Sequence, residues 1–414
     1  MKRMVMAGFT AAMMALGGMT LAEPGNAAAP RSQMTGHVLV KFRDSGAAGT
    51  ALQSYGLKGG AGIGSTGAQL VQVPAGKEQQ LIEALSRNPA VEYAESDELA
   101  TVATADQYFP GQYALQNDGQ SFTSTGGTLT VEGGKADADV DAVEAWDVTT
   151  GNGTKVAIVD TGVASDNPDI SPKVVARANF SDSPTAEDLY GHGTHVAGIV
   201  AATADNTLGV AGVCPACTIL DAKVLNDDGT GSTSRIAEGI DWAVSNGAQV
   251  INMSLGLGVP SRTLETAVNN AWKHGVVIVA AAGNAGTQAK VYPGAYSNVI
   301  AVAATDNADA KAPFSTYGKW VDVAAPGVNI YSTFPNHPFQ LGADGRRSQG
   351  YDVESGTSMA SPVVAGVAAL AWSAHADATN KSVRADLEST ADEISGTGTA
   401  WAHGRVNANN AVRQ

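Results

Sequence analysis

Apolar runs without polar alternation recur through the longer, C-terminal part of the chain. Strands with this pattern are buried on both faces, which is the habit of parallel sheets. Amphipathic stretches separate the runs, and alternating strands and helices predict an α/β fold with a doubly wound, mostly parallel sheet. The six runs are Val156–Val159, Ile219–Leu225, Val250–Leu255, Val276–Ala282, Val299–Ala304 and Val321–Ala325.

Two of the amphipathic stretches show clear helix ends. Thr233–Asn246 is followed by Gly247, and Arg262–His274 is followed by Gly275. A glycine just past the last helical residue is a common stop, because it adopts the left-handed conformation without strain. In open α/β sheets reactive groups gather at the carboxyl ends of the strands, so we expect a functional site at that edge.

Shorter elements near the N-terminus indicate a small α+β domain, which we place at residues 34–103. A polar linker follows it, and the longer domain occupies residues 105–414. The helix-like segment of the small domain stops before Asn88-Pro89, as a proline boundary predicts. The expected elements are strands at His37–Phe42, Gln69–Val73 and Val91–Tyr93, and a helix at Glu78–Arg87.

The first 22 residues have the pattern of a signal peptide. Lys2 and Arg3 precede the apolar stretch Met4–Leu21, and Thr20-Leu21-Ala22 offers a small-residue cleavage site. The stretch is long enough to span a membrane, so an anchor is the alternative. No basic stop-transfer cluster follows it, which favours export with removal of residues 1–22. We therefore expect a secreted protein with no membrane association after removal.

Composition and charge narrow the class of partner. The chain has 414 residues, of which 44% are hydrophobic and 16% are charged, as in a globular protein. Its formal net charge is −15 and its pI is near 4.8. Nucleic acid and anionic membranes repel such a protein, so neither is expected as a partner.

The two cysteines, Cys214 and Cys217, stand in a C-x-x-C arrangement. No second cysteine pair is present to complete a zinc site. In an exported protein a short-loop disulfide is favoured. A redox motif and two unpaired structural thiols remain as alternatives.

Three loops carry candidate catalytic groups. Asp160 ends the first apolar run, His192 lies between glycines, and Ser358 opens an apolar helix. Nucleophilic catalysis by serine needs a base within hydrogen-bond reach and a carboxylate that orients the base. Taken singly, each residue has a structural alternative: a strand-end cap, a packed turn and a helix N-cap.

The order of these three loops resembles a known family. Asp160-Thr161-Gly162, His192-Gly193-Thr194-His195 and the block Gly356–Pro362 are similar, in that order, to the three signature blocks of the subtilisins. The similarity extends over about Gln107–Asn407, and Thr266–Thr333 most resembles the thermitase branch of the family.

The resemblance implies a role for each of these residues. Ser358 would attack the peptide carbonyl, His192 would take and later donate the proton, and Asp160 would orient the imidazole. His195 is assigned to structure. Asn284, which follows a predicted strand, would bind the oxyanion together with the backbone N–H of the nucleophile.

The resemblance also implies where a peptide substrate binds. Ser254, Leu255 and Gly256 would form an exposed edge that pairs with the substrate as a strand. Small residues in the opposite wall leave room for a large apolar side chain, so broad, mostly apolar specificity is expected. Leu257 stands where relatives often carry glycine. The opposite wall is Ala281, Ala282 and Gly283.

A structural calcium ion is a further implication of the resemblance. Calcium prefers oxygen ligands from carboxylates and loop carbonyls. A second, weaker cation is expected near Tyr296, Val299 and Asp322, and the alternative for all these positions is solvated surface carboxylates. The first site would use side chains of Asp106, Asp169 and Asn206 and carbonyls of Thr203, Leu208 and Val210.

The small N-terminal domain resembles the propeptide of this family, a ferredoxin-like inhibitor and folding chaperone. The linker after it would then enter the cleft as a substrate and be cut, whereas the alternative is an ordinary accessory domain. The sequence therefore predicts a secreted, monomeric serine endopeptidase that acts on proteins or peptides. It would be calcium-stabilised and made as a self-processing zymogen. The rival functions are a catalytically silent binding protein on the same fold and an esterase-type hydrolase, whose Ser…Asp…His order does not fit.

Overall fold

The computed structural model describes residues 34–98 and 106–414, apart from residues 45, 47, 75 and 346. The predicted signal peptide at residues 1–22 lies outside the described residues. So do the linker and the expected boundaries at residues 103 and 105.

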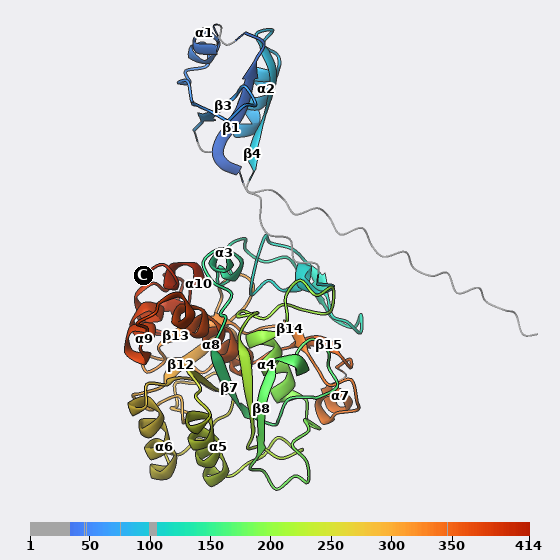
Figure 1. Cartoon of the computed structure of the whole chain (residues 1–414), viewed down its shortest axis with the longest axis vertical. Helices are drawn as coiled ribbons and strands as arrows, with labels where there is room; N and C mark the ends of the chain where they lie inside the picture. The colour runs from blue at the N-terminus through green and yellow to red at the C-terminus, as the bar shows by residue number, and fades with distance from the viewer. Residues whose placement is uncertain (1–33, 45, 47, 75, 99–105, 346) are drawn as a thin grey trace, which may run out of the picture. The chain divides into compact units, whose positions relative to one another are not determined.

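The N-terminal part is a four-stranded antiparallel sheet with two helices (Figure 1). Its strand order, β2-β3-β1-β4, and its β-α-β-β-α-β sequence confirm the ferredoxin-like prediction. Val38 and Val40 alternate inward from β1 and pack with Leu52 and Leu85 of the two helices. The elements are β1 (Met34–Phe42), α1 (Ala48–Gln53), β2 (Ala61–Gly62), β3 (Ala68–Gln72), α2 (Glu78–Ser86) and β4 (Val91–Glu98).

The C-terminal part is built on one eight-stranded sheet with the order β16-β13-β12-β11-β10-β7-β9-β8. Every neighbouring pair in it is parallel, and helices connect most strands, which confirms the doubly wound prediction. The strands are β7 (Lys155–Asp160), β8 (Val174–Asn179), β9 (Thr218–Lys223), β10 (Val250–Met253), β11 (Val277–Ala281), β12 (Ile300–Thr305), β13 (Val323–Pro326) and β16 (Gly404–Arg405).

Strand β7 lies at the point where the strand order reverses. The chain adds β9 on one side of β7 and then crosses to add β10 on the other side. Because all these strands are parallel, their carboxyl ends share one edge of the sheet. Ligands bind at such a switch point in doubly wound folds.

Helices cover both faces of this sheet. Val156 and Ile158 of β7 pack into one apolar core, and Ala157 and Val159 pack into the other, because successive strand side chains point to opposite faces. Figure 1 shows α5 and α6 side by side over the second core. The covering helices are α4 (His192–Ala201) and α8 (Thr357–Ala374) on the first face, and α5 (Thr233–Ser245) and α6 (Arg262–Lys273) on the second.

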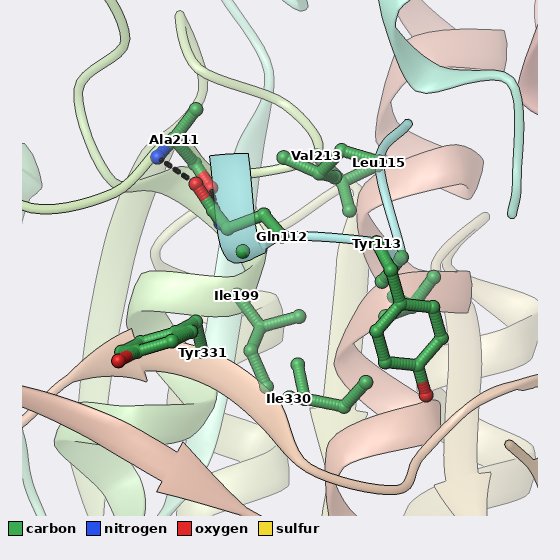
Figure 2. Close-up of a pocket in the computed structure, with 11 residues that line it drawn as sticks. Gln112, Tyr113, Leu115, Ile199, Ala211, Val213, Ile330 and Tyr331 are labelled. Atoms are coloured by element: carbon green, nitrogen blue, oxygen red, sulfur yellow. Dashed lines mark hydrogen bonds between the residues drawn. The ribbon is translucent and has the colours of Figure 1, made fainter. Parts of the chain in front are cut away.

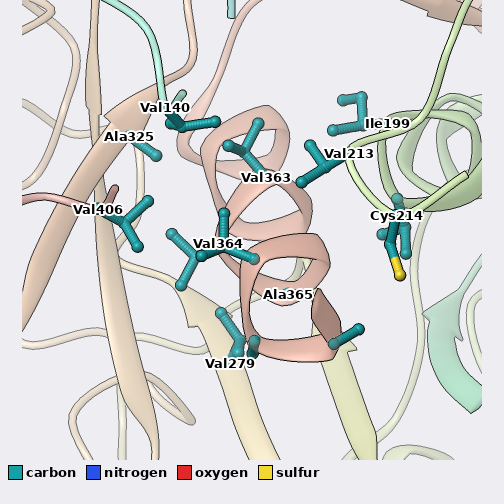
Figure 3. Close-up of a cluster of buried hydrophobic side chains, with 14 of the residues drawn as sticks. Val140, Ile199, Val213, Cys214, Val279, Ala325, Val363, Val364, Ala365 and Val406 are labelled. Carbon is teal, nitrogen blue, oxygen red and sulfur yellow. The ribbon is translucent and has the colours of Figure 1, made fainter. Parts of the chain in front are cut away.

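Helix α8 is the centre of the first core. Figure 3 shows Val363 and Val364 of α8 among side chains that include Val279 of β11 and Ala325 of β13. Its mean hydropathy of 1.3 makes it long and apolar enough to cross a membrane, judged by length and composition alone. Most of α8 is buried inside the protein, as is usual for a core helix.

Several short elements are not predicted from the sequence, because runs of two to six residues carry little periodicity. Among them β14 and β15 form an antiparallel pair that leads directly to α8. They are α1, β2, β8 and β16, whose bounds are given above, and η2 (Phe109–Gly111), β5 (Phe122–Thr123), β6 (Thr130–Val131), α3 (Ala142–Trp146), η3 (Ser171–Lys173), β14 (Ile330–Thr333), α7 (Gln340–Gly345), β15 (Tyr351–Glu354) and α10 (Ala408–Ala411); the longer α9 (Asn380–Ser389) is not predicted either.

The side-chain amide of Gln112 holds its segment in place through both its nitrogen and its oxygen. Its side chain donates to the carbonyl of Ala211 at 2.7 Å and accepts from the Ala211 N–H at 2.8 Å (Figure 2). The adjoining apolar cavity, lined by Ile199, Ile330 and Tyr331 among others, has a volume of about 10 Å³. That is about the space of one water molecule, so this cavity holds no larger ligand.

Cys214 and Cys217 form a disulfide with a Cα–Cα distance of 5.4 Å. The short-loop disulfide interpretation is therefore confirmed, and the unpaired-thiol alternative is wrong.

Candidate active site

Asp160 and His192 form a direct hydrogen-bonded pair. Asp160 is the last residue of β7 and is fully buried. Its Oδ1 accepts from the backbone N–H of Thr161 at 2.7 Å and lies 2.7 Å from Nδ1 of His192. With Nδ1 bonded to a carboxylate, Nε2 is the ring nitrogen left to exchange a proton with another group.

Glycines allow the chain carrying His192 to approach its neighbours closely. Gly191, just before α4, has φ +102°, and a Cβ there would lie 2.4 Å from the ring of Phe339. A Cβ on Gly193 would lie 2.2 Å from the carbonyl oxygen of Gly162. Both contacts are too short for any side chain, so these glycines are required for His192 to reach Asp160.

The surroundings of His192 favour its protonated form. Burial lowers the pKa of its imidazole, but the charge of Asp160, the hydrogen bond to it and the charges of Asp188 and Glu354 together raise the pKa further than burial lowers it. The net direction is upward from the ordinary value. A proton received by His192 is therefore stabilised by Asp160.

A buried carboxylate that the sequence analysis misses, Asp188, joins the Asp160 and His192 segments. Its Oδ1 accepts from Thr161 Oγ1 at 2.9 Å and from the N–H of Gly191 at 2.8 Å. Its Oδ2 accepts from the N–H of Thr194 at 2.9 Å. Asp188 lies just before the N-terminus of α4, where the helix dipole favours a negative charge. An acidic residue at that position is the sequence signal that could have indicated Asp188.

His195, the second histidine of the motif, lies in the core. Its ring is buried and is 4.8 Å from the ring of Phe334, and Nε2 is 3.3 Å from the carbonyl oxygen of Asp352. Burial lowers the pKa of His195 to about 4, so the ring stays neutral near pH 7. This environment fits the structural role expected for it.

Hydrogen bonds join the start of α8 to the end of β10. Ser358, the second residue of α8, has Oγ 3.3 Å from the carbonyl oxygen of Ser254, and Ser254 Oγ donates to the Ser358 carbonyl at 2.7 Å. Below them, Asn252 donates to Ser254 Oγ at 3.0 Å and accepts from Ser361 Oγ at 2.7 Å. Since β10 is the neighbour of β7, Ser358 lies at the same sheet edge as Asp160.

Asn284 is oriented by a residue that the sequence analysis misses, Thr357. Asn284 Oδ1 accepts from both the N–H and Oγ1 of Thr357, each at 2.9 Å. The amide NH₂ therefore points away from Thr357, and among the described residues it has no protein acceptor. The N–H of Ser358 in the first turn of α8 also lacks an intrahelical partner. Two donors are thus available beside the Ser358 side chain.

A pocket of about 330 Å³ opens next to Ser358 and Asn284. Five of the six residues expected to bind substrate line it: Ser254, Leu255, Gly256, Ala281 and Gly283. Ala282 does not line it, because the side chain of Ala282 packs in the core with Ala301 and Trp401. The pocket is also lined by Asn284 and Ser358, and by four residues that were not expected to bind substrate: Leu257, Gly258, Val291 and Thr357.

Val291 lies close to Gly256 and Gly283 on the two sides of this pocket. A Cβ on Gly256 would lie 2.4 Å from Val291 Cγ1, and one on Gly283 would lie 2.9 Å from Val291 Cγ2. The isolated β-bridge between Leu257 and Tyr292 holds the two sides together, with N–H···O distances of 2.7 and 2.9 Å. Val291 lies far from Gly256 in sequence, so no local pattern indicates their contact.

The structure brings together the three side chains predicted to bind calcium. Asn206 Nδ2 donates to Asp169 Oδ1 at 2.7 Å, and the Asn206 N–H donates to Asp106 Oδ1 at 3.0 Å. The predicted carbonyl residues lie in the same loop. Thr203 N–H bonds the Asp169 carbonyl, Val210 N–H bonds Asp169 Oδ2, and Leu208 N–H bonds Asn206 Oδ1.

The charge of this cluster fits a cation. Asp106 and Asp169 are buried, and no basic group of the described residues lies within 4.0 Å of either carboxylate. Burial raises the pKa of Asp169 to about 6. The two buried carboxylates are the kind of oxygen ligand that Ca²⁺ prefers, whereas the Asn206 amide presents its NH₂ to Asp169 and its oxygen to the Leu208 N–H.

The second cation expected near Tyr296, Val299 and Asp322 is not supported. Asp322 Oδ1 lies 2.8 Å from Arg384 Nη2, and Arg384 Nη1 donates to the carbonyl of Ser297 at 2.8 Å. A guanidinium already supplies the positive charge at this position. The local sequence does not indicate this ion pair, because Arg384 lies 62 residues after Asp322 in the chain.

Comparisons with known proteins bear on both parts of the chain. The model of the subtilase family matches residues 151–410, and the model of the fervidolysin N-terminal prodomain matches residues 23–97. Thermitase from Thermoactinomyces vulgaris is 51% identical over 275 residues, which are 66% of this chain and 94% of that protein.

Two further relatives cover more of the chain. A thermophilic serine proteinase from Bacillus sp. (strain AK1) is 44% identical over 342 residues, which are 81% of this chain and 76% of that protein. The solved structure of a protease from Pseudoalteromonas arctica superposes with a TM-score of 0.65 at 31% identity and covers 75% of this chain and 98% of its own.

Proposed function

Because the chain belongs to the subtilase family of serine proteases and carries an N-terminal prodomain, we propose that it is a secreted, calcium-stabilised endopeptidase made as a self-processing zymogen. The observation that carries the catalytic assignment is the 2.7 Å contact between Asp160 and His192 at the sheet edge where Ser358 begins α8.

The proposed reaction is acyl transfer through Ser358. His192 takes the proton from Ser358 Oγ as the oxygen attacks the peptide carbonyl, and it later donates that proton to the leaving amine. Asp160 holds the imidazole in the tautomer with Nδ1 protonated and stabilises the imidazolium that forms. The raised pKa of His192 has the direction that this role requires.

The oxyanion is stabilised by the two available donors beside Ser358. The Asn284 NH₂ and the backbone N–H of Ser358 donate to the carbonyl oxygen as it becomes negative. Thr357 holds the Asn284 amide in place before substrate arrives, so no reorganisation is needed during reaction. In the subtilisin family, removing such an amide lowers turnover by about 10²–10³-fold.

The 330 Å³ pocket is proposed to take the substrate side chain that precedes the scissile bond. Its walls, Leu255, Ala281 and Val291, are apolar, which supports mostly apolar specificity. Substrate backbone would pair with Ser254, Leu255 and Gly256 as an added strand. The enzyme's substrates are proteins or peptides, and it is proposed to act as a monomer.

Calcium is proposed to be held by Asp106, Asp169 and Asn206 with carbonyls of the surrounding loop. The ion would supply the positive charge that these buried carboxylates lack, and it would join the chain near Asp106 to the loop after α4. Export and maturation are supported by the apolar segment at residues 1–22 and by the prodomain match.

The test is covalent labelling with a fluorophosphonate, which reacts with an activated serine nucleophile. The protein should be labelled, and Ser358→Ala should not be labelled, should fail to cleave casein, and should accumulate as the uncut precursor. Ser395→Ala, which removes an exposed serine outside the site, should behave as the parent. A catalytically silent binding protein would remain unlabelled in every form.

A further inference from the structure

A second set of metal-ligand side chains comes from segments next to the proposed catalytic pair, Asp160 and His192, and from the segment after β14. Asp166, Glu187 and His337 each present one ligand atom, and these atoms all lie within 4.8 Å of one another. They come from the segment after β7, the segment before α4 and the segment after β14. The cluster is separate from the calcium residues and contains an imidazole, which calcium does not use.

The contacts of the two ring nitrogens of His337 require either a second ring proton or a metal ion. Nε2 of His337 is 3.1 Å from the carbonyl oxygen of Asp188, and Nδ1 is 2.9 Å from Asp166 Oδ2. Both ring nitrogens thus face oxygen acceptors, but a neutral imidazole has only one N–H. If Nε2 carries that hydrogen, the lone pair of Nδ1 meets a carboxylate lone pair unless a cation lies between them.

The arrangement around His337 is that of a ligating histidine. A metal-bound histidine commonly donates its other ring N–H to a backbone carbonyl, which fixes the tautomer, and the Asp188 carbonyl provides that acceptor here. The carboxylates are oriented as well. Asn336 N–H donates to Asp166 Oδ1 at 3.1 Å, and Ser165 donates to both oxygens of Glu187 at 2.7 Å. Arg177 Nη1 lies 3.7 Å from Glu187 Oε2, so a metal ion would share the charge of Glu187 with this guanidinium.

We infer that Asp166, Glu187 and His337 form a binding site for a transition-metal ion such as Zn²⁺, which clamps the segment after β14 to the segments on either side of the catalytic pair. Tetrahedral Zn²⁺ with ligand bonds of about 2.1 Å has ligand atoms roughly 3.4 Å apart. The partly exposed carboxylates can close the remaining distance by side-chain rotation, and water completes the coordination.

The clamp acts on the segment that carries the catalytic histidine. The N–H of Gln340 bonds the Leu189 carbonyl at 2.9 Å, and the N–H of Leu341 bonds the Tyr190 carbonyl at 3.0 Å. Residues 337–341 thus already pair with the chain immediately before His192. A metal ion at His337 would fix this pairing and so stabilise the position of α4. Only this consequence rests on the proposed function; binding itself does not.

The experiment uses full-length protein carrying Ser358→Ala, freed of metal by chelation and kept in millimolar calcium so that oxygen-ligand sites are filled. Co²⁺ is titrated while its d–d absorption is recorded, followed by displacement with Zn²⁺ and measurement of the melting temperature. We expect one equivalent of Co²⁺ bound with nitrogen and oxygen ligation, displaced by Zn²⁺, and a melting temperature that rises with Zn²⁺.

Variants locate the site. His337→Gln and Asp166→Asn should each weaken Co²⁺ binding by at least about tenfold. His403→Gln, which removes a histidine near a single carboxylate, Glu388 at 3.8 Å, should not. A cooperative melting transition recorded without Co²⁺ or Zn²⁺ serves as the control that each variant is folded. The inference is overturned if no Co²⁺ binds, if binding survives both variants, or if NMR shows His337 protonated and unresponsive to Zn²⁺ at pH 8. If Co²⁺ binds but the protein with Ser358 intact is not labelled by the fluorophosphonate, the proposed enzymatic function is wrong and the metal site is retained.

Discussion

Replacing Asp188 with asparagine tests whether the hydrogen-bonded pair of Asp160 and His192 depends on this buried carboxylate. Asparagine keeps one acceptor oxygen, which can still serve the Thr161 hydroxyl and the Gly191 N–H. Its NH₂ replaces Oδ2 and faces the N–H of Thr194, so two donors meet in a buried position. Asp188→Asn therefore loses charge-assisted bonds and leaves a backbone donor unsatisfied.

The expected cost of this change is about 3 kcal/mol, since hydrogen bonds to charged groups contribute about 1.5–3 kcal/mol and an unsatisfied buried donor costs about 1–3 kcal/mol. Unfolding entropy of about 2.1 cal/mol/K per residue over about 300 residues gives roughly 0.6 kcal/mol/K. The melting temperature should thus fall by about 5 °C. A displaced His192 should also lower kcat/KM by about 10–100-fold.

Calorimetry in the Ser358→Ala background measures the melting temperature without self-digestion, and peptide hydrolysis by the otherwise unchanged enzyme measures kcat/KM. Asp182→Asn is the matched control, because Asp182 is an exposed carboxylate paired with Arg235 and should contribute less than about 1 kcal/mol. If Asp188→Asn melts within 1 °C of its parent and keeps full activity, the proposed linkage between the two segments is wrong.

Three other predictions concern the proposed machinery. A general base must be neutral, so kcat/KM should fall about tenfold per pH unit below the pKa of His192, with a midpoint above the ordinary value of about 6.5; a midpoint below 6.5 would contradict the pairing with Asp160. Removing calcium present at a hundredfold excess over Kd should cost about 2.7 kcal/mol, or about 4 °C of melting temperature. The folded-state pKa of Asp169 is raised to about 6, so its proton is bound more tightly in the apo fold and competes with calcium. The calcium effect should therefore be larger at pH 8 than at pH 5, and an unchanged melting curve in chelator would remove the assignment. Asn284→Ala should lower kcat by about 10²–10³-fold with little change in KM, whereas an equal change in KM alone would indicate a role in ground-state binding.

The sheet could be predicted from the sequence because its strands are buried on both faces. Each long apolar run corresponds to a strand of the main sheet, and Gly247 and Gly275 end α5 and α6 with positive φ. Short elements such as α1 and β15 lack a detectable period and were not predicted. Their formation depends on tertiary contacts that the local sequence does not encode.

The residues of the site likewise differ in whether the nearby sequence indicates them. Asp160, His192 and Ser358 were predictable because each lies beside a strand end or helix start with diagnostic glycines. Val291 contacts Gly256, which is distant in the chain, so no local pattern indicates it. Asp188 does have a local signal, its position before the N-terminus of α4, but its bond to Thr161 depends on the fold. The failed second cation site has the same cause.

If the chain is exported as proposed, the apolar character of α8 limits how hydrophobic this enzyme's core can become. Such a chain crosses a membrane before it folds, and at that stage an 18-residue segment with mean hydropathy 1.3 is exposed to lipid as a potential stop signal. Alanines and glycine in α8, together with Ser358, Ser361 and Pro362, hold its mean hydropathy below that of a helix made only of larger apolar residues. Alanine-to-leucine changes that fill space around α8 would therefore act against passage of the chain, even where they improve packing. Under the proposed export, evolution of this core would be constrained by a step that takes place before the core exists.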